Sequence, residues 1–294
     1  MNVSLIIAEV DVSESRENRN EIFGGNPAQN AGIPTRNVMR DDFGVEIPVE
    51  TVPLPSSGLI YPPGSPLAES ETVEIRAMTA REEDILTSRA LIKKGTVITE
   101  LLKSCLIDKN IDPDALLSGD RNAIMTAVRI TGYGADYTVD IDCPSCGEKS
   151  KQNFRLTDLP IKRLEINPVE IGKNLFEFKL PVSGKNIQFR FLTGKDEQEI
   201  SVISERKKKQ GQQSDNLITQ KLMYSIVSID GTTDKVKVQA FIRNMPARDS
   251  LALRKFMDAN EPGIDMKSWM ECPSCDESSE VRLPLGVSFF WPES

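Results

Sequence analysis

The order of hydrophobic and polar residues predicts a chain of short helices and β-hairpins. Residues 73–77 alternate between apolar and polar side chains, which is the period of a half-buried strand. Apolar residues then recur at helical spacing over residues 81–94 and 97–106, and again after Asp120. These stretches predict one strand followed by three short helices, which together form a helical subdomain.

Local signals mark the ends of these helices. Thr79 and Glu82 have the spacing of a capping box, and Gly95 follows the first helical stretch as a stop. The glycine-rich triplet at residues 132–134 ends the third stretch. We therefore expect one continuous helix over residues 81–94.

Strand-like alternation surrounds both copies of a short cysteine motif. Residues 137–141 lead into the first copy and residues 154–156 leave it, which predicts a hairpin with cysteines at its tip. Another hairpin is expected over residues 175–192, with its turn at residues 183–185. Helices are then predicted at residues 196–209, 214–229 and 247–258, and the second cysteine hairpin follows the last of them.

The part of the chain before the first strand has a different composition. Residues 13–43 contain too few hydrophobic side chains to offset the entropy lost on ordering. We expect an arm that is disordered alone and orders on a partner, with residues 3–7 as an apolar hook; a dispensable tail is the alternative. Residues 45–66 contain six prolines, which exclude a long helix and a central strand and predict an extended, turn-rich wrap.

Length and charge narrow the possible functions. The chain has 294 residues and a formal net charge of −8, and its pI is near 5.0. This acidic balance argues against a general nucleic-acid binder, which needs basic surface to displace counterions from phosphates. No apolar run approaches the roughly 18 residues of a membrane span, and acids flank the opening MNVSLIIAEVDVSE, unlike a signal peptide. We therefore expect a cytosol-like compartment, where thiols stay reduced.

The tetrapeptide CPSC occurs twice, and it carries the clearest chemistry. Two C-x-x-C pairs supply four thiolates, the number that closes a tetrahedral structural zinc site. Gly147 follows the first copy and can take the positive φ that such a turn often needs, whereas Asp276 stands at the matching place in the second. The sequence predicts one structural zinc ion bound by Cys143, Cys146, Cys272 and Cys275.

Two alternatives use the same cysteines. A redox pair favours C-x-x-C at a helix N-terminus, where the dipole lowers the pKa of a thiol, but strand-like residues flank both copies. A catalytic zinc needs an open coordination position, and four thiolates leave none. The chain also has no histidine, glycine-rich phosphate loop or nucleophile elbow, so we expect neither an enzyme nor a small-molecule substrate.

The distance between the cysteine pairs shapes the predicted fold. Between Cys146 and Cys272 lie 125 residues (272 − 146 − 1), so a shared ion requires the hairpins to meet in space around an inserted lobe. The predicted class is α+β, with a helical subdomain and β-hairpins around a four-cysteine, zinc-ribbon-like centre, an inserted α+β lobe and an extended N-terminal arm. The predicted boundaries are 1–44 for the arm, 45–160 for the wrap, helical subdomain and first hairpin, 161–265 for the lobe, and 266–294 for the second hairpin and an aromatic tail.

Two other features have structural explanations. Cys105 lies in the apolar phrase ELLKSCLI and is predicted to be a small buried hydrophobe. The basic run at residues 206–209 ends a predicted helix, where cations complement the helix dipole. A nucleic-acid contact is less favoured there, because no aromatic residues are interleaved to stack on bases.

Several long phrases resemble one known family. The chain contains, in this order, SSGLIYPPGSPL, TVEIRAMTAREEDILTSRALIKKGTVI, GDRNAIMTAVRITGYG, DIDCPSCGEKS and PLGVSFFWP. Together they resemble the baseplate hub proteins of bacteriophage T4-type contractile tails, over residues 45–292. The resemblance implies a structural part of a virion tail baseplate, assembled in the host cytoplasm. Other baseplate and hub proteins and the tape-measure protein are the implied partners.

The aromatic tail supplies the candidate interface residues Phe289, Phe290 and Trp291, because aromatic side chains give a large contact area at low entropic cost. The alternative is that these rings anchor the tail on its own domain. Two further functions stay open at this point: an assembly chaperone that leaves before the virion matures, and a zinc-ribbon nucleic-acid-binding protein.

Overall fold

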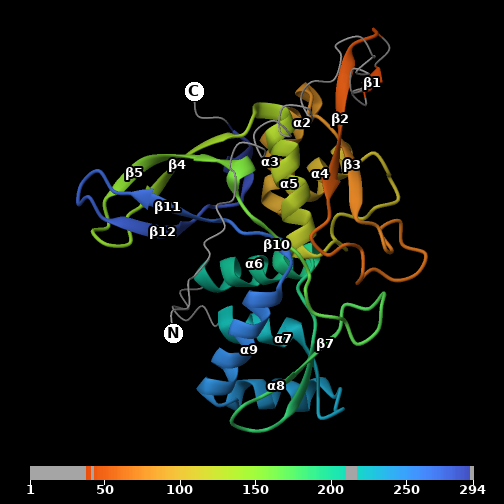
Figure 1. The fold of residues 1–294 in the computed structure, drawn as a ribbon, viewed down its shortest axis with the longest axis vertical. Coiled ribbons are helices and arrows are strands. Elements are labelled where there is room, and N and C mark those ends of the chain that lie inside the picture. The colour runs from red at the N-terminus through yellow and green to blue at the C-terminus, as the bar shows by residue number, and fades with distance from the viewer. Residues whose placement is uncertain (1–37, 41–42, 210–216, 292–294) are drawn as a thin grey trace, which may run out of the picture. The chain divides into compact units, whose positions relative to one another are not determined.

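The computed structural model describes residues 38–40, 43–209 and 217–291, which belong to one unit, Asn37–Ser294 (Figure 1). The predicted arm, residues 1–44, lies almost entirely outside the described residues. The strands are β1 Val38–Arg40, β2 Glu46–Pro53, β3 Thr72–Arg76, β4 Asp136–Asp142, β5 Lys149–Arg155, β6 Ile161–Lys162, β7 Phe176–Lys179, β8 Asn186–Phe189, β9 Ile226–Ile229, β10 Gly263–Ile264, β11 Lys267–Glu271 and β12 Ser278–Arg282. The helices are α2 Ala80–Thr87, α3 Arg89–Lys94, α4 Val97–Cys105, α5 Ser118–Tyr133, α6 Gly194–Lys209, α7 Leu217–Ser225, α8 Lys235–Asn244 and α9 Ala247–Asn260, with short 3-10 turns η1 Leu156–Asp158 and η2 Val287–Phe290.

The prediction that prolines exclude a central strand is wrong for β2, which lies between β1 and β3 in a three-stranded sheet. β1 pairs with residues 46–48 of β2, and β3 pairs with residues 49–53. The two pairings meet only at Pro48, which lies opposite Val38 and whose carbonyl accepts from the N–H of Ala77 over 2.9 Å; among the described residues, the rest of β2 pairs on one side. Pro48 and Pro53 are tolerated because each half of the strand keeps an open side on which a missing N–H costs nothing.

The wrap predicted over residues 45–66 is turn-rich only from residue 54, its turns continue to residue 71, and a buried carboxylate connects them to α5. The N–H and Oγ of Ser56 donate to the carboxylate of Asp120 over 2.9 and 2.6 Å, and the hydroxyl of Tyr61 donates to it over 2.6 Å. Asp120 was expected to open the third helix. It lies instead inside α5, with its side chain completely buried, because its role is to accept hydrogen bonds from the wrap.

The helical subdomain consists of α2 to α5, and its first helix is broken. Thr79 and Glu82 form the predicted capping box, and Gly95 ends α3 in the left-handed conformation, with φ of 73°. The continuous helix expected over residues 81–94 is interrupted at Ser88, whose extended backbone separates α2 from α3. Serine favours helix ends over helix interiors, since its hydroxyl competes for backbone hydrogen bonds.

The segment predicted as an inserted lobe begins and ends at two short strands that pair with each other. In the β6–β10 pair, Ile161 lies opposite Ile264 and Lys162 opposite Gly263. This pair packs on the first turn of α5, where a Cβ atom added at Gly119 would lie 1.7 Å from the carbonyl oxygen of Pro262. Only glycine fits at position 119, so the backbones of α5 and the lobe can approach closely. The boundaries of the lobe at residues 161 and 265 stay a prediction.

Inside the lobe, an antiparallel sheet of β7, β8 and β9 packs around aromatic side chains. Phe176, Phe189 and Phe191 are completely buried, and their ring centroids lie 4.9 to 5.7 Å apart. Such tilted and edge-on contacts are the arrangements that aromatic pairs prefer. These rings belong to the same hydrophobic cluster as the buried residues of α4 and α5.

Two elements of the lobe differ from the prediction. The helix expected over residues 214–229 ends at Ser225, and residues 226–229 form β9, because they complete the sheet by pairing with β8. Helix α8 was not predicted. Asp234 caps α8 by accepting hydrogen bonds from the backbone N–H groups of Val236 and Lys237.

Candidate metal centre

Each CPSC motif lies at the tip of an antiparallel hairpin. β4 pairs with β5 over their whole length, and β11 pairs with β12 in the same way. The two hairpins lie side by side (Figure 1), and Nε2 of Gln152 on β5 donates to the carbonyl of Glu271 on β11 over 3.0 Å. Two segments far apart in the sequence therefore present their cysteines to the same place.

The two tips have the same backbone geometry. The N–H groups of Cys143 and Cys272 each donate to the carbonyl five residues later, over 2.9 and 3.1 Å. The N–H groups of Gly147 and Asp276 each donate back to the cysteine carbonyl four residues earlier, both over 2.9 Å. Gly147 has φ of 76° and Asp276 has φ of 54°. The left-handed conformation expected at Gly147 is present in both copies, and aspartate tolerates it better than most residues.

The hairpins bring all four sulfur atoms together. Sγ of Cys143 lies 3.9 Å from Sγ of Cys275, and Sγ of Cys146 lies 3.6 Å from Sγ of Cys272. All four ligand atoms lie within 4.8 Å of one another. A tetrahedral ion with metal–sulfur bonds of about 2.3 Å separates its sulfur ligands by about 3.8 Å. The four side chains therefore fit a single metal ion.

The centre has an inner and an outer side. Cys143 and Cys272 are buried, whereas Cys146 and Cys275 are exposed, and all four are free thiols. Backbone N–H groups of Ser274 and Cys275 donate to the sulfur of Cys272 and lower its pKa to about 7. Metal binding requires thiolates, so this hydrogen bonding favours the ligand form of Cys272 near neutral pH.

The ends of the cysteine hairpins that lie away from the CPSC tips contact the segment that follows β12. The hydroxyl of Tyr137 on β4 donates to the carbonyl of Pro284 over 3.2 Å, and the Tyr137 ring meets the Phe289 ring edge-on, with centroids 5.0 Å apart. The N–H of Leu283 donates to the carbonyl of Met266 over 2.7 Å. The C-terminal segment thus packs against the roots of both cysteine hairpins.

The predicted interface residues lie in this segment. Phe289 and Phe290 are completely buried, and Trp291 is half-buried against the same core. The arrangement matches the alternative in which the tail anchors on its own domain, and it leaves neither phenylalanine ring exposed to another protein. Two residues remote in sequence hold Phe289: the Tyr137 ring packs on its ring, and Nε of Arg129 donates to its carbonyl. Trp291 alone of the three keeps exposed surface.

The remaining sequence features are placed as follows. Cys105 is completely buried on α4, and burial raises the pKa of its thiol to about 12. It therefore behaves as the small hydrophobe that was predicted. Helix α6 extends through the basic run to Lys209, with Arg206 exposed. Arg129, which holds the C-terminal segment, was not singled out, although an arginine inside the apolar phrase AVRITGY is a signal for a buried polar role.

Helix, sheet and the four-thiol cluster together define an α+β protein with a candidate metal centre. Among the described helices, none combines the length and apolar character that a membrane crossing requires. The chain belongs to the T4 bacteriophage base plate protein family, whose model matches residues 65–291. No curated protein and no solved structure matches the chain.

Family membership confirms the resemblance to T4-type baseplate proteins. It supports a structural role in a phage baseplate, in which the chain interacts with other baseplate proteins, and it suggests a location in the virion tail.

Proposed function

We propose that this protein is a structural subunit of the hub region of a contractile phage tail baseplate, in which one zinc ion joins the two cysteine hairpins of its body. The observation that carries the proposal is the family match over residues 65–291, which spans helices α2 to α9 and both hairpins. The proposed subunit acts in tail assembly through protein–protein contacts. Other hub proteins and the tape-measure protein are the proposed partners.

Zinc is the ion that the donor set supports best. Tetrahedral sites of four thiolates bind zinc or iron, and zinc is the usual structural ion where tight C-x-x-C turns supply both halves. Cys143, Cys146, Cys272 and Cys275 would hold it. Four thiolates leave no open position for a water molecule, so the proposed role of the ion is structural. Its effect would be to fix β4–β5 against β11–β12, with the lobe between them.

The proposed role is non-enzymatic. The described side chains with the most perturbed environments, such as Asp120 and Glu82, have hydrogen-bond partners that explain their positions without catalysis. The sequence contains no histidine to act as a general base at neutral pH.

We propose that the protein assembles in the host cytoplasm and remains in the mature tail.

Complementation of a phage that lacks this gene tests the proposed role. We expect the full chain to restore infectious particles and to be detected by mass spectrometry in purified virions. A chain found in assembly intermediates but missing from finished particles would instead be an assembly chaperone, and the proposal of a permanent subunit would be wrong.

Deleting residues 2–40, most of which lie outside the described residues, should leave the body folded while weakening incorporation, because an arm that orders on a partner contributes binding only there.

A gel-shift measurement at physiological salt separates the proposal from a zinc-ribbon nucleic-acid-binding role. With a formal net charge of −8, the chain should not shift duplex or single-stranded probes, since nucleic-acid binding depends on basic side chains that displace counterions from the phosphates. A salt-sensitive shift by the purified chain would contradict this expectation.

A further inference from the structure

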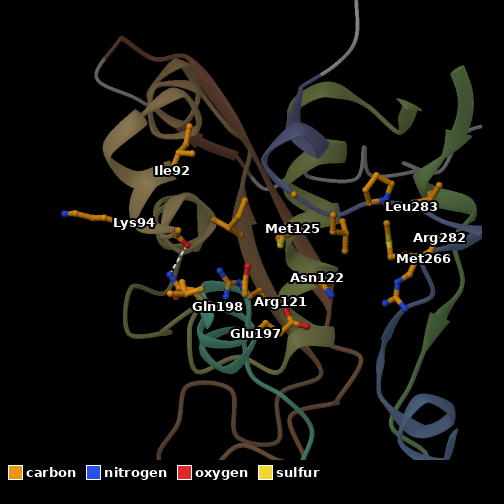
Figure 2. A pocket seen from close by; sticks show the side chains of 18 of the residues that line it. Ile92, Lys94, Arg121, Asn122, Met125, Glu197, Gln198, Met266, Arg282 and Leu283 are labelled. Atoms are coloured by element: carbon orange, nitrogen blue, oxygen red, sulfur yellow. Dashed lines mark hydrogen bonds between the residues drawn. The ribbon is translucent and has the colours of Figure 1, made fainter. Parts of the chain in front are cut away.

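Two hollows form one continuous groove beside α5. The α7–α9 hollow lies between those two helices and has a volume of about 570 Å³, and the α5–α6 hollow lies between the end of α3, α5, α6 and residues 283–286, with a volume of about 580 Å³. Asn122, Glu197, Met266 and Arg282 line both hollows. Figure 2 shows the α5–α6 hollow, with Lys94 on one side and Arg282 on the other.

Apolar side chains are exposed along the α7–α9 hollow. Leu217 is 38% exposed, Ile218 is 50% exposed and Leu251 is 44% exposed. They come from two different helices and line the same concave surface. Aliphatic side chains that share one hollow, rather than being scattered singly, mark a surface that another molecule covers.

Each of these helices places a cation one turn after its exposed leucine. Lys221 follows Leu217 by four positions on α7, and Lys255 follows Leu251 by four positions on α9. Residues four apart lie on the same helix face. Both helices therefore present to the hollow an aliphatic side chain with a positive charge beside it.

Positive charge continues along the groove. Among the described residues, seven of its cations have no ion-pair partner: Lys93, Lys94, Lys162, Lys221, Arg254, Lys255 and Arg282. Four acidic side chains line it, and one of them, Glu261, has its pKa raised to about 7 by burial and by the nearby charge of Glu197. The groove is thus a cationic strip on a chain whose formal net charge is −8.

Unpartnered polar atoms also gather at the α7–α9 hollow. In the described chain, the hydroxyls of Ser118 and Ser225 and the Nε of Arg254 are buried and have no hydrogen-bond partner. Ser118 is 3% exposed and Ser225 is 1% exposed. All three residues line this hollow. Buried polar groups in native proteins are normally paired, so these three atoms are exceptions that lie in residues lining one hollow.

We propose that this groove binds an acidic amphipathic segment of another tail protein, with the aliphatic side chains of that segment between α7 and α9 and its carboxylates against Lys221, Lys255 and Arg254. The identity of the partner as a tail protein rests on the proposed function; the groove itself does not. Charge complementarity selects an acidic occupant over a basic one. Each hollow has the size that holds a small ligand or a few side chains, so the occupant is a segment rather than a folded domain.

Such a segment would bridge two parts of the chain. Its binding surface is built from α7 and α9 of the lobe and from α5 and β12 of the body. A bound segment therefore contacts both at once. Amphipathic segments that lie in a groove are recognised through apolar anchors about one turn apart on the segment itself.

The test uses synthetic peptides tiled across the baseplate and tape-measure proteins of the same phage, with the purified full-length chain as receptor and fluorescence anisotropy as readout. We expect the peptides that bind to carry both carboxylates and large aliphatic side chains. The variant Lys221→Glu/Lys255→Glu and the variant Leu251→Asp should each weaken binding by about tenfold or more. The matched controls are Lys235→Glu and Val236→Asp, which change exposed residues of the same types on α8, away from the groove.

The outcomes separate the possible occupants. Binding that is lost in both groove variants and kept in both controls supports the proposal, provided that each variant melts like the wild-type chain. Preferential binding of basic peptides, or equal binding by wild-type and variants, overturns it. Complete competition by inorganic phosphate alone would identify a small-anion site instead. Concentration-dependent self-association that Leu251→Asp abolishes would identify a second copy of this chain as the occupant. Complementation by the wild-type gene is scored separately, so the proposed function and the groove can fail independently.

Discussion

Nε of Arg129 on α5 donates a hydrogen bond to the backbone carbonyl of Phe289, 3.1 Å away and 160 residues later in the chain. Its two other nitrogens donate to the carbonyls of Gly134 and Asp136 over 2.8 and 3.0 Å. Burial lowers the pKa of this guanidinium. All three of these hydrogen-bond partners are neutral carbonyls. Arg129 therefore connects α5, the start of β4 and the C-terminal segment through hydrogen bonds.

Replacing Arg129 should therefore destabilise the fold strongly. Arg129→Met removes three donors and leaves three carbonyls without them, and we expect a loss of about 3 kcal/mol in the free energy of unfolding. Chemical denaturation measures this loss. The control Arg243→Met changes an exposed arginine at the end of α8 and should change stability little. Equal effects of the two substitutions would contradict the assigned role.

The aromatic tail gives a second prediction, because Phe290 and Trp291 differ in burial. Phe290→Ala creates a cavity in the core and should cost about 3–5 kcal/mol of stability, which thermal melting detects as a lower Tm. Trp291→Ala should cost less, since its ring is only half-buried. If Trp291 instead contacts a partner, Trp291→Ala will assemble poorly while melting normally. A Phe290→Ala variant that melts like the wild-type chain would show that its ring is not a core residue.

Metal analysis tests the cysteine centre directly. Protein purified without added zinc should contain close to one equivalent of zinc, and Cys272→Ser should lose it. We expect this variant to melt at a lower temperature over the whole unit, because binding free energy at such a site is also folding free energy. The loss should be smaller than the roughly 10 kcal/mol typical of zinc-dependent small domains, since a large core remains. Cys105→Ser, at the one cysteine outside the centre, should keep its metal. A fully folded, metal-free wild-type chain with four titratable thiols in the hairpins would rule out a structural ion.

The pH dependence of stability should report on Glu82. Burial opposes ionisation of this carboxyl, but hydrogen bonds from Arg76, Ser104 and Thr79 outweigh it and lower the pKa to about 2, from an ordinary 4.5. A depressed folded-state pKa means that the ionised group stabilises the fold above pH 4.5. This stabilisation is lost as the pH falls from 4.5 through 2, by about 3 kcal/mol. Glu82→Gln should flatten that part of the stability profile, whereas Glu100→Gln, at an exposed position of α4, should leave its slope unchanged. An identical acid profile for wild-type and Glu82→Gln would contradict the assignment.

Local signals predicted the parts of the fold that depend on neighbouring residues. The capping box of Thr79 and Glu82, the stop at Gly95 and the hairpins around CPSC all follow from spacing within a few positions. The cysteine cluster was predictable for a different reason. Four thiols in two matching turns satisfy the coordination number of one ion only if they come together, so the chemistry fixed a contact that periodicity could not.

Features that depend on remote partners were not predictable. Residues 226–229 continue a helical pattern, but pairing with β8 converts them to a strand, as tertiary contacts often override local preference. The prolines of β2 predicted that this segment could not be a central strand. It is one because β1 and β3 pair with different parts of β2, and this staggered pairing accommodates the prolines. Phe289 is held by Arg129 and Tyr137, and although an arginine in an apolar phrase indicates a buried role, nothing near it in the sequence identifies Phe289 as its partner.

The separation of the cysteine pairs has a consequence for how the protein is made. Cys143 and Cys146 leave the ribosome first, and the helices of the lobe follow before Cys272 and Cys275 can join them. Domains generally fold in the order of their synthesis, yet here half of the ligands arrive only after α9 is complete. Any product that stops before Cys272 carries only two of the four thiols and lacks the second hairpin. In the proposed zinc-bound form, only a finished chain would hold the ion with all four thiolates.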